Sequence, residues 1–425
     1  MARAAQRAGR EAQSTGLLVA ALLAAAGCAN QGPPPGGPPD TAPPSIVRIE
    51  PESGAVAPGW KGDAVIHFDE VIEEMPDALA KLVLLSPVAG DVQVSWGRTR
   101  IRVKPKEGWK GNRVYRLQLL PGVVDLRRNK LDSGRVVLFS TGPEIGHATL
   151  AGRALQWVEQ RTLARALIEA IPLPDTVGYL TLADSAGRFA LAALRPGRYL
   201  VYASADANTN HRRDAREPYD SALVTLDSNA TLALFTFVHD SVGPRPRTVT
   251  AIDSVTARID FSQALNPAVT LDTSRIAVRQ LPDSSPVALR AVLTQRQYDS
   301  LAAAERAAAK PDTGAARADS AVRLDTAVSP GAPRGEAPKG AAGDTVVARD
   351  TAEVHRLLAQ RPVPFDKVVL RFVRPLPPET RYVVLVHGAA NLNGATADGL
   401  AVLTMPKPVA RDTTRNRPRT TPKPP

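Results

Sequence analysis

Short runs of alternating apolar and polar residues dominate the chain between about residues 45 and 143. Val92, Val94 and Trp96 fall on one face of an expected strand, and after a glycine turn a return strand begins at Ile101. A period of two places successive side chains on opposite faces of a sheet. Several short strands separated by turns predict an antiparallel β-sandwich over this segment.

The same pattern returns late in the chain, over about residues 244–406. Ala257-Arg-Ile-Asp-Phe-Ser262 parallels Ala64-Val-Ile-His-Phe-Asp69, and the stretch that begins at Arg381 parallels the one that begins at Val114. This repetition predicts a second, divergent copy of the first sandwich.

Residues 299–354 interrupt this second copy and have a different composition. The stretch from Asp299 to Lys310 is rich in Ala, Glu, Arg and Leu, which favours a short helix. The remainder, to about Thr351, holds too few large apolar residues to order itself. We therefore expect a mobile, partly helical insertion between two strands of the sandwich.

The middle segment, about residues 145–240, has a pattern of its own. Tyr179-Leu-Thr-Leu182 alternates, Asp184-Ser-Ala-Gly187 is a turn, and Arg188-Phe-Ala-Leu191 returns as the second strand of a hairpin. The fold class predicted for the whole chain is therefore all-β, with sandwiches in tandem and a disordered or partly helical insertion.

These segments resemble two known families. Pro51-Glu-Ser-Gly54, Ile66-His-Phe-Asp-Glu-Val71 and Phe139-Ser-Thr-Gly142 are similar to SbsA-type bacterial Ig-like domains, which implies a seven-stranded spacer or adhesive module without catalytic residues. Asp184-Ser-Ala-Gly-Arg-Phe189 and Leu194-Arg-Pro-Gly-Arg-Tyr199 resemble the carboxypeptidase-regulatory-like domain, a transthyretin-like sandwich. No peptidase segment accompanies it, so this second resemblance implies no enzymatic activity.

The N-terminus has the pattern of a secretory signal. Arg3, Arg7 and Arg10 precede an apolar run that starts at Leu17 and ends at Cys28, the only cysteine. This run is shorter than the roughly 20 residues that a membrane-spanning helix needs. The sequence therefore predicts an exported chain.

The end of this run resembles the lipobox of bacterial lipoproteins. Ala25-Ala-Gly-Cys28 carries the small residues that precede the lipid-modified cysteine in that family, although Leu is usual where Ala25 stands. The resemblance implies a diacylglycerol on Cys28 and, because Ala29 is not Asp, an outer-membrane location. The alternative is ordinary cleavage after Ala26, which leaves a secreted protein with a free thiol.

These patterns divide the chain into six predicted segments. They are a signal peptide (1–27), a lipidated Pro/Gly-rich linker (28–44), an Ig-like sandwich (45–143), a carboxypeptidase-regulatory-like sandwich (145–240), a divergent Ig-like sandwich (244–406) with the mobile insertion (299–354), and a disordered basic tail (407–425).

The charge balance is basic, with 53 Lys and Arg against 42 Asp and Glu, a formal net charge of +11. Such a balance suits nucleic acid or an anionic surface. Export argues against nucleic acid, so we expect none as a partner. The tail at 407–425 is either a disordered end or a contact to anionic lipopolysaccharide or peptidoglycan.

One stretch in the middle segment has the spacing of a metal site. Residues 206–217 place oxygen-bearing side chains at positions one, three, five, nine and twelve, as in the calcium loop of EF-hands. Position seven offers its carbonyl oxygen, and position six is His211 where the loop prefers glycine. The predicted ligands of a weak structural calcium ion are Asp206, Asn208, Asn210, Arg212, Asp214 and Glu217. The alternative is a metal-free loop braced by Asx turns and Asp–Arg pairs.

Other chemistry is sparse. The six histidines are scattered without zinc-ligand spacing, and the sequence motifs of metalloproteases, serine hydrolases and phosphate-binding loops are absent from the sequence. We therefore expect no enzyme and no catalytic residues. Four tryptophans leave a sugar-binding platform open, although Trp96 continues a core face.

The function predicted from sequence is that of a cell-envelope lipoprotein with a structural, spacer or adhesive role. It would display its modules from a membrane to which an N-terminal lipid attaches it. The alternative is a surface lipoprotein that captures a glycan or protein partner through the loops of its sandwiches.

Overall fold

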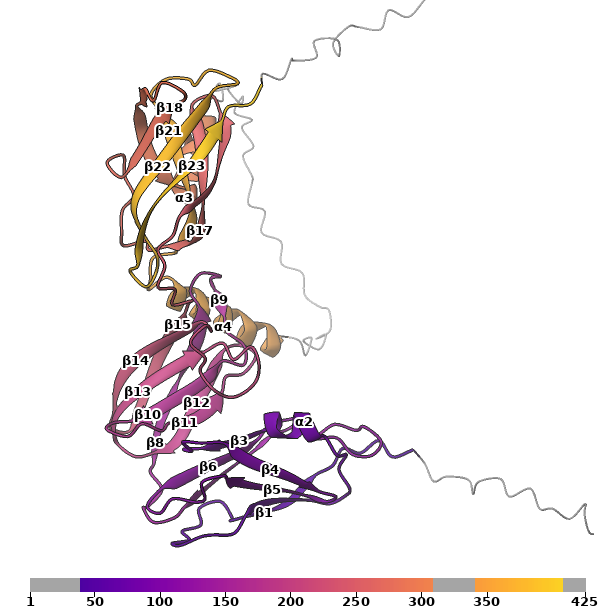
Figure 1. Cartoon of the computed structure of the whole chain (residues 1–425). Helices are drawn as coiled ribbons and strands as arrows, with labels where there is room; N and C mark the ends of the chain where they lie inside the picture. Colours follow the sequence, from indigo (N-terminus) through magenta and orange to yellow (C-terminus); the bar gives the residue numbers. More distant parts are fainter. Residues whose placement is uncertain (1–38, 309–340, 408–425) are drawn as a thin grey trace, which may run out of the picture.

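The computed structural model describes residues 39–308 and 341–407. Figure 1 shows three β-sandwiches that follow one another along the chain, which we call modules 1, 2 and 3. Among the residues that the structure describes, strand accounts for 47% and helix for 9%, which confirms the predicted class of tandem β-sandwiches. The predicted signal segment, Cys28 and most of the predicted basic tail lie outside the described residues.

The elements of module 1 are β1 (Ile46–Glu50), β2 (Ala64–Phe68), α2 (Pro76–Leu79), η1 (Ala80–Leu82), β3 (Val83–Ser86), β4 (Val92–Gly97), β5 (Arg100–Pro105), β6 (Val114–Leu119) and β7 (Arg135–Ser140). One sheet has the order β1-β2-β5-β4 and the other the order β3-β6-β7. This strand order is that of the immunoglobulin constant-type sandwich. The predicted hairpin forms as β4 and β5, with Trp96 opposite Ile101.

The core of module 1 lies between these two sheets and centres on aromatic side chains. Tyr115 is 1% exposed, and its ring lies 4.8 Å from Trp109 and 5.6 Å from Phe139. The Tyr115 hydroxyl accepts a hydrogen bond of 2.8 Å from the backbone N–H of Lys110. A buried tyrosine that reaches back to the backbone just before its own strand is the tyrosine corner of Ig-like sandwiches.

The elements of module 3 are β16 (Pro246–Asp253), β17 (Thr256–Leu265), β18 (Ile276–Gln280), β19 (Pro286–Val287), β20 (Leu289–Thr294), α3 (Gln295–Ala308), α4 (Ala341–Leu358), β21 (Phe365–Phe372), β22 (Arg381–Ala390) and β23 (Thr396–Thr404). Its sheets have the orders β16-β17-β21-β20 and β19-β18-β22-β23. Apart from β19, this is the strand order of module 1, in agreement with the repetition in the sequence.

The elements of module 2 are β8 (Ala148–Gln156), β9 (Arg161–Thr162), β10 (Leu167–Pro172), β11 (Tyr179–Leu182), β12 (Arg188–Leu194), β13 (Gly197–Ser204), β14 (Tyr219–Leu226) and β15 (Asn229–Thr236). One sheet has the order β11-β10-β13-β14, and the other has the order β12-β8-β15 with β9 beside β8. The first and last long strands, β8 and β15, pair in parallel.

The insertion of module 3 lies between β20 and β21, where module 1 has the tight turn between β4 and β5. Helix α3 begins at Gln295, close to the predicted start. Helix α4 extends from Ala341, inside the segment for which composition predicts no order. Its C-terminal part packs on module 2, which supplies the contacts that its own composition lacks. In the described part of the chain, no helix is long and apolar enough to cross a membrane.

Polar contacts join modules 1 and 2. The backbone N–H of Leu180 donates to the Ser86 hydroxyl at 2.9 Å, and Arg113 pairs with Asp175 at 3.1 Å. Arg116 of β6 is 7% exposed at this interface, and burial lowers the pKa of its guanidinium to about 10. Across the interface it donates to the Thr181 hydroxyl, at 3.4 Å.

Modules 2 and 3 meet at a short connection and at α4. Asn391, which is 2% exposed, donates through its amide to the carbonyl oxygens of Asp240 and Val242 at 2.8 and 3.1 Å. This contact fixes the connection against the end of β22. Figure 1 shows α4 where module 2 meets module 3.

Candidate functional site

The predicted calcium loop lies in the hairpin between β13 and β14 of module 2. The two strands pair along their length up to Ser204 and Tyr219. The backbone N–H of Ala205 donates to the carbonyl of Pro218 at 2.9 Å, which closes the neck of the loop. The loop therefore begins at the next residue, Asp206, and leaves from the hydrogen-bonded ends of β13 and β14.

Side-chain oxygens inside the loop turn toward its backbone. The Asp206 carboxylate accepts the N–H groups of Asn210 and His211 at 3.0 and 2.9 Å. Asn208 accepts the N–H of Asn210 at 2.9 Å, and Asn210 accepts that of Arg212 at 2.8 Å. These are consecutive Asx turns, which curl the chain so that alternate side chains face a common centre.

The last two predicted positions close the loop. Glu217 is 9% exposed and accepts the N–H groups of Ala207 and Asp214 at 2.9 and 3.4 Å. Asp214 accepts the side-chain amides of Asn208 and Asn210 at 2.8 and 3.2 Å. The structure thus links the side chains of five predicted positions into one network, and that of Arg212 points elsewhere.

Two basic residues of the loop, Arg212 and Arg213, are engaged outside this network. The Arg212 guanidinium pairs with Asp91 of module 1, and that of Arg213 stacks over the Tyr202 ring at 4.1 Å. His211 at position six adopts φ +57°, the left-handed conformation that glycine would supply without strain. Burial lowers the pKa of the His211 imidazole, so a neutral side chain stands at this position.

These features fit a calcium ion in part. The loop offers three carboxylates, two amide oxygens and one backbone carbonyl, which are hard oxygen ligands of the kind that calcium takes. The side-chain amides of Asn208 and Asn210 now donate to Asp214, so an ion would require both to turn their oxygens inward. The acids of the loop do not gather within 4.8 Å of one another as a separate group does.

That separate group consists of Asp40, Glu70 and Asp125 in module 1, among the residues that the structure describes. Asp125 is 1% exposed and is already bound by the Asn129 side chain and by backbone N–H groups at 2.7–2.8 Å. Burial and then the charge of Asp125 raise the pKa of Glu70. Sequence reasoning missed this group because its members are far apart in the chain.

Three of the four tryptophans serve the cores and interfaces. The indole N–H groups of Trp96, Trp109 and Trp157 donate to the carbonyls of Ile72, Gly62 and Pro362, respectively. Trp109 packs on the tyrosine corner, and Trp157 packs on α4. The indole N–H groups of these three tryptophans are therefore used within the protein, and the sugar-binding platform stays a prediction.

A cavity of about 690 Å³ lies between modules 1 and 2, beside the loop. Arg212 and Arg213 line one side of it, and Val88 and Leu84 of module 1 line another. Glu169 of β10 also faces it, and burial raises the pKa of this carboxyl group. The loop therefore forms part of the junction between the two modules.

The fold and the site define a tandem β-sandwich protein with a polar loop at the junction of modules 1 and 2. Residues 40–141 match the family described as bacterial Ig-like domain, which covers module 1. A comparison with curated proteins finds no match.

Three of the solved structures that this chain matches are distant likenesses. The N-terminal part of the bacterial S-layer protein SbsC is 12% identical over 40% of this chain and 25% of its own, with a TM-score of 0.21. A DUF3823 family protein from Parabacteroides merdae is 14% identical over 32% of this chain and 67% of its own, at 0.18. BcpA, the major pilin subunit of Bacillus cereus, is 8% identical over 45% of this chain and 70% of its own, with a TM-score of 0.17. None of these scores supports an assignment of function.

Proposed function

We propose that this protein is a lipid-anchored cell-envelope protein whose three sandwiches act as a spacer or adhesive stalk. The observation that carries the proposal is the series of three modules, each with its own buried core, behind a signal-like segment that ends in the only cysteine. A diacylglycerol on Cys28 would hold the chain to a membrane, and by resemblance Ala29 favours the outer membrane. The Pro/Gly-rich linker would separate module 1 from the lipid surface.

The junctions between modules support a stiff spacer. Each junction carries hydrogen bonds or ion pairs as well as the covalent connection, as for Arg113 with Asp175 and Asn391 with Asp240. Neighbouring domains move relative to one another by default unless their interface is large and apolar. Here the polar contacts and the apolar contact of α4 with module 2 both oppose such motion. A stalk of this construction presents its distal module at a defined distance from its anchor.

The first prediction concerns Cys28. Intact mass of the protein from its native membrane is expected to show a chain that begins at Cys28 and carries a diacyl or triacyl group. Cys28→Ser is expected to remove this mass and to abolish stable attachment to the membrane, because the serine hydroxyl does not replace the thiol that receives the lipid.

The matched control is Ala29→Asp, which keeps the cysteine. By the resemblance, this variant is expected to stay lipidated and to move to the inner membrane fraction. An unlipidated wild-type chain that begins near Gly27 and fractionates with soluble proteins would contradict the proposal.

We also propose that the loop 206–217 binds calcium weakly, with a Kd on the order of 10⁻⁴ to 10⁻³ M, as extracellular modules do. The ligands would be the side-chain oxygens of its five networked positions and the carbonyl oxygen of Arg212. The loop lines the junction with module 1, so an ion that orders it would also stiffen this part of the stalk.

The second prediction follows from this loop. With a Kd of about 1 mM, calcium at about 10 mM is expected to stabilise module 2 by about 1.4 kcal/mol, roughly 5–10 °C in its midpoint of unfolding. Asp206→Asn is expected to abolish this shift, because it removes one of three negative charges and keeps the shape of the side chain. Calorimetry with and without calcium measures both.

The control is Asp132→Asn, which changes an exposed acid of module 1. It is expected to leave the calcium shift unchanged. Equal shifts in wild type and Asp206→Asn would refute the site, as would loss of the shift in the control.

A further inference from the structure

Helix α4 belongs to the insertion of module 3 and packs on module 2. Asp350, Val354 and Leu358 are spaced by four residues, so they lie along one face of the helix. Leu357 and Glu353 stand beside them on the same side. This face combines carboxylates at one end with apolar side chains at the other.

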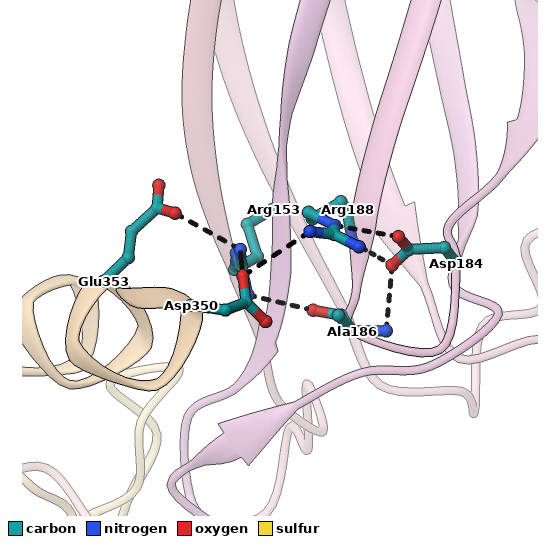
Figure 2. Close-up of polar contacts among 6 residues, drawn as sticks. All are labelled: Arg153, Asp184, Ala186, Arg188, Asp350 and Glu353. Carbon is teal, nitrogen blue, oxygen red and sulfur yellow. Dashed lines mark hydrogen bonds and ion pairs between the residues drawn. The ribbon is translucent and has the colours of Figure 1, made fainter. Parts of the chain in front are cut away.

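The carboxylate end meets a buried arginine of module 2 (Figure 2). The Arg153 side chain in β8 is 4% exposed, and its guanidinium pairs with Asp350 and, at 3.3 Å, with Glu353. It also donates to the carbonyl of Ala186 at 3.2 Å. Within the described residues, both carboxylates that pair with this buried charge therefore come from α4.

Neighbouring charges strengthen this contact. Arg188 approaches Asp350 at 3.7 Å and is held by Asp184, to which its Nε donates at 2.9 Å. The hydrogen bond from Arg153 keeps the pKa of Asp350 below its usual range. Asp350 is thus ionised where two guanidinium groups converge.

The apolar end of α4 covers a second patch of module 2. Leu358 is 5% exposed and packs with Leu155, Trp157 and Phe235. Just beyond the helix, the Pro362 carbonyl accepts the Trp157 indole N–H at 3.1 Å, and the Arg361 guanidinium lies 4.4 Å from the Phe235 ring. The contact therefore continues to the start of β21.

We propose that α4 is a latch that fixes module 3 on module 2. The helix ends at Leu358 and β21 begins at Phe365, so the docked helix holds the sandwich to which it leads. Undocking would take both ion-pair partners away from Arg153, and the loss of these pairs opposes release. The released form would let module 3 turn about the connection near Asp240 to Val242. This device does not depend on the lipid anchor or on calcium.

The third prediction tests the latch by hydrogen exchange on the full-length chain. Asp350→Asn combined with Glu353→Gln is expected to speed exchange of the α4 amides by about tenfold or more, because the buried guanidinium loses both partners. Small-angle X-ray scattering is expected to show a broader spread of chain dimensions. The slow amides of the module 2 core are expected to keep their rates.

Two further variants separate the latch from simple weakening of the helix. Adding Arg153→Met to the double variant is expected to restore protection of α4, because the buried charge that needs the carboxylates is then absent. Glu305→Gln removes an ion pair within module 3, between Glu305 of α3 and Arg371 of β21. It is expected to leave the exchange rates of the α4 amides unchanged.

Three outcomes would overturn the latch. The first is wild-type exchange of α4 in the double variant. The second is failure of Arg153→Met to restore protection. The third is loss of protection across the module 2 core together with α4, which would mean that the carboxylates support the fold of module 2 and not the docking.

Discussion

Trp157→Ala is expected to lower the free energy of unfolding of module 2 by about 3–5 kcal/mol, the range for removal of a large buried aromatic side chain. Trp157 is 9% exposed and lies edge-on to Phe237, with 5.6 Å between the ring centroids. The substitution leaves a void against Leu358 and removes the indole N–H from the Pro362 carbonyl. Urea denaturation followed by circular dichroism measures the change.

The control is Val238→Ala, one residue after Phe237. Val238 is 56% exposed, so its truncation is expected to change stability by less than about 0.5 kcal/mol. A loss of under about 1 kcal/mol for Trp157→Ala would contradict the buried packing of the indole. Because α4 covers the same patch, its amides are also expected to exchange faster in Trp157→Ala.

The sandwiches were predictable because strand alternation is a local signal. Val92, Val94 and Trp96 mark one face of β4 without knowledge of any other segment, and Ile101 follows at hairpin distance. The repeat was equally visible, because modules 1 and 3 keep the same strand order and therefore the same spacing of apolar pairs. The alternation of apolar and polar residues within one strand is enough to predict which of its side chains are buried.

The order of α4 was not predictable from composition, because its partner is elsewhere. Asp350 pairs with Arg153, 197 residues earlier in the chain. A signal was present in the helical spacing of Asp350, Val354 and Leu358, but the Ala- and Pro-rich surroundings favoured disorder. A segment of low hydrophobicity becomes ordered when a neighbouring module offers a buried charge and an apolar patch together.

The polar loop and the acid group also differ in whether their residues are close together or far apart in the sequence. Asp206 to Glu217 lie in one hairpin, so the inward-facing network follows from their spacing alone. Asp40, Glu70 and Asp125 meet only because different segments of module 1 fold together. Motif spacing therefore finds a site within one loop, and it misses a cluster that the tertiary fold assembles.

Gly152→Ala is expected to destabilise module 2 by about 3 kcal/mol, at the upper end for overpacking a well-filled site. A Cβ at this position of β8 would lie 2.1 Å from the carbonyl oxygen of Leu232 and 2.8 Å from the Phe189 ring. Leu232 lies opposite Gly152 in the parallel β8–β15 pair, so relief requires the backbones of the two strands to separate. Thermal denaturation measures the loss.

The matched control for this glycine is Gly111→Ala in module 1. A Cβ there would meet no atom within 4 Å, and its backbone lies outside the left-handed region. It is expected to be neutral or to stabilise by about 0.4–1 kcal/mol, because alanine lowers the entropy of the unfolded chain. Equal effects of the two substitutions would show that β8 and β15 do not approach as closely as their register requires. A loss confined to Gly152→Ala would confirm a close backbone contact between β8 and β15 beside Arg153, the residue on which α4 docks.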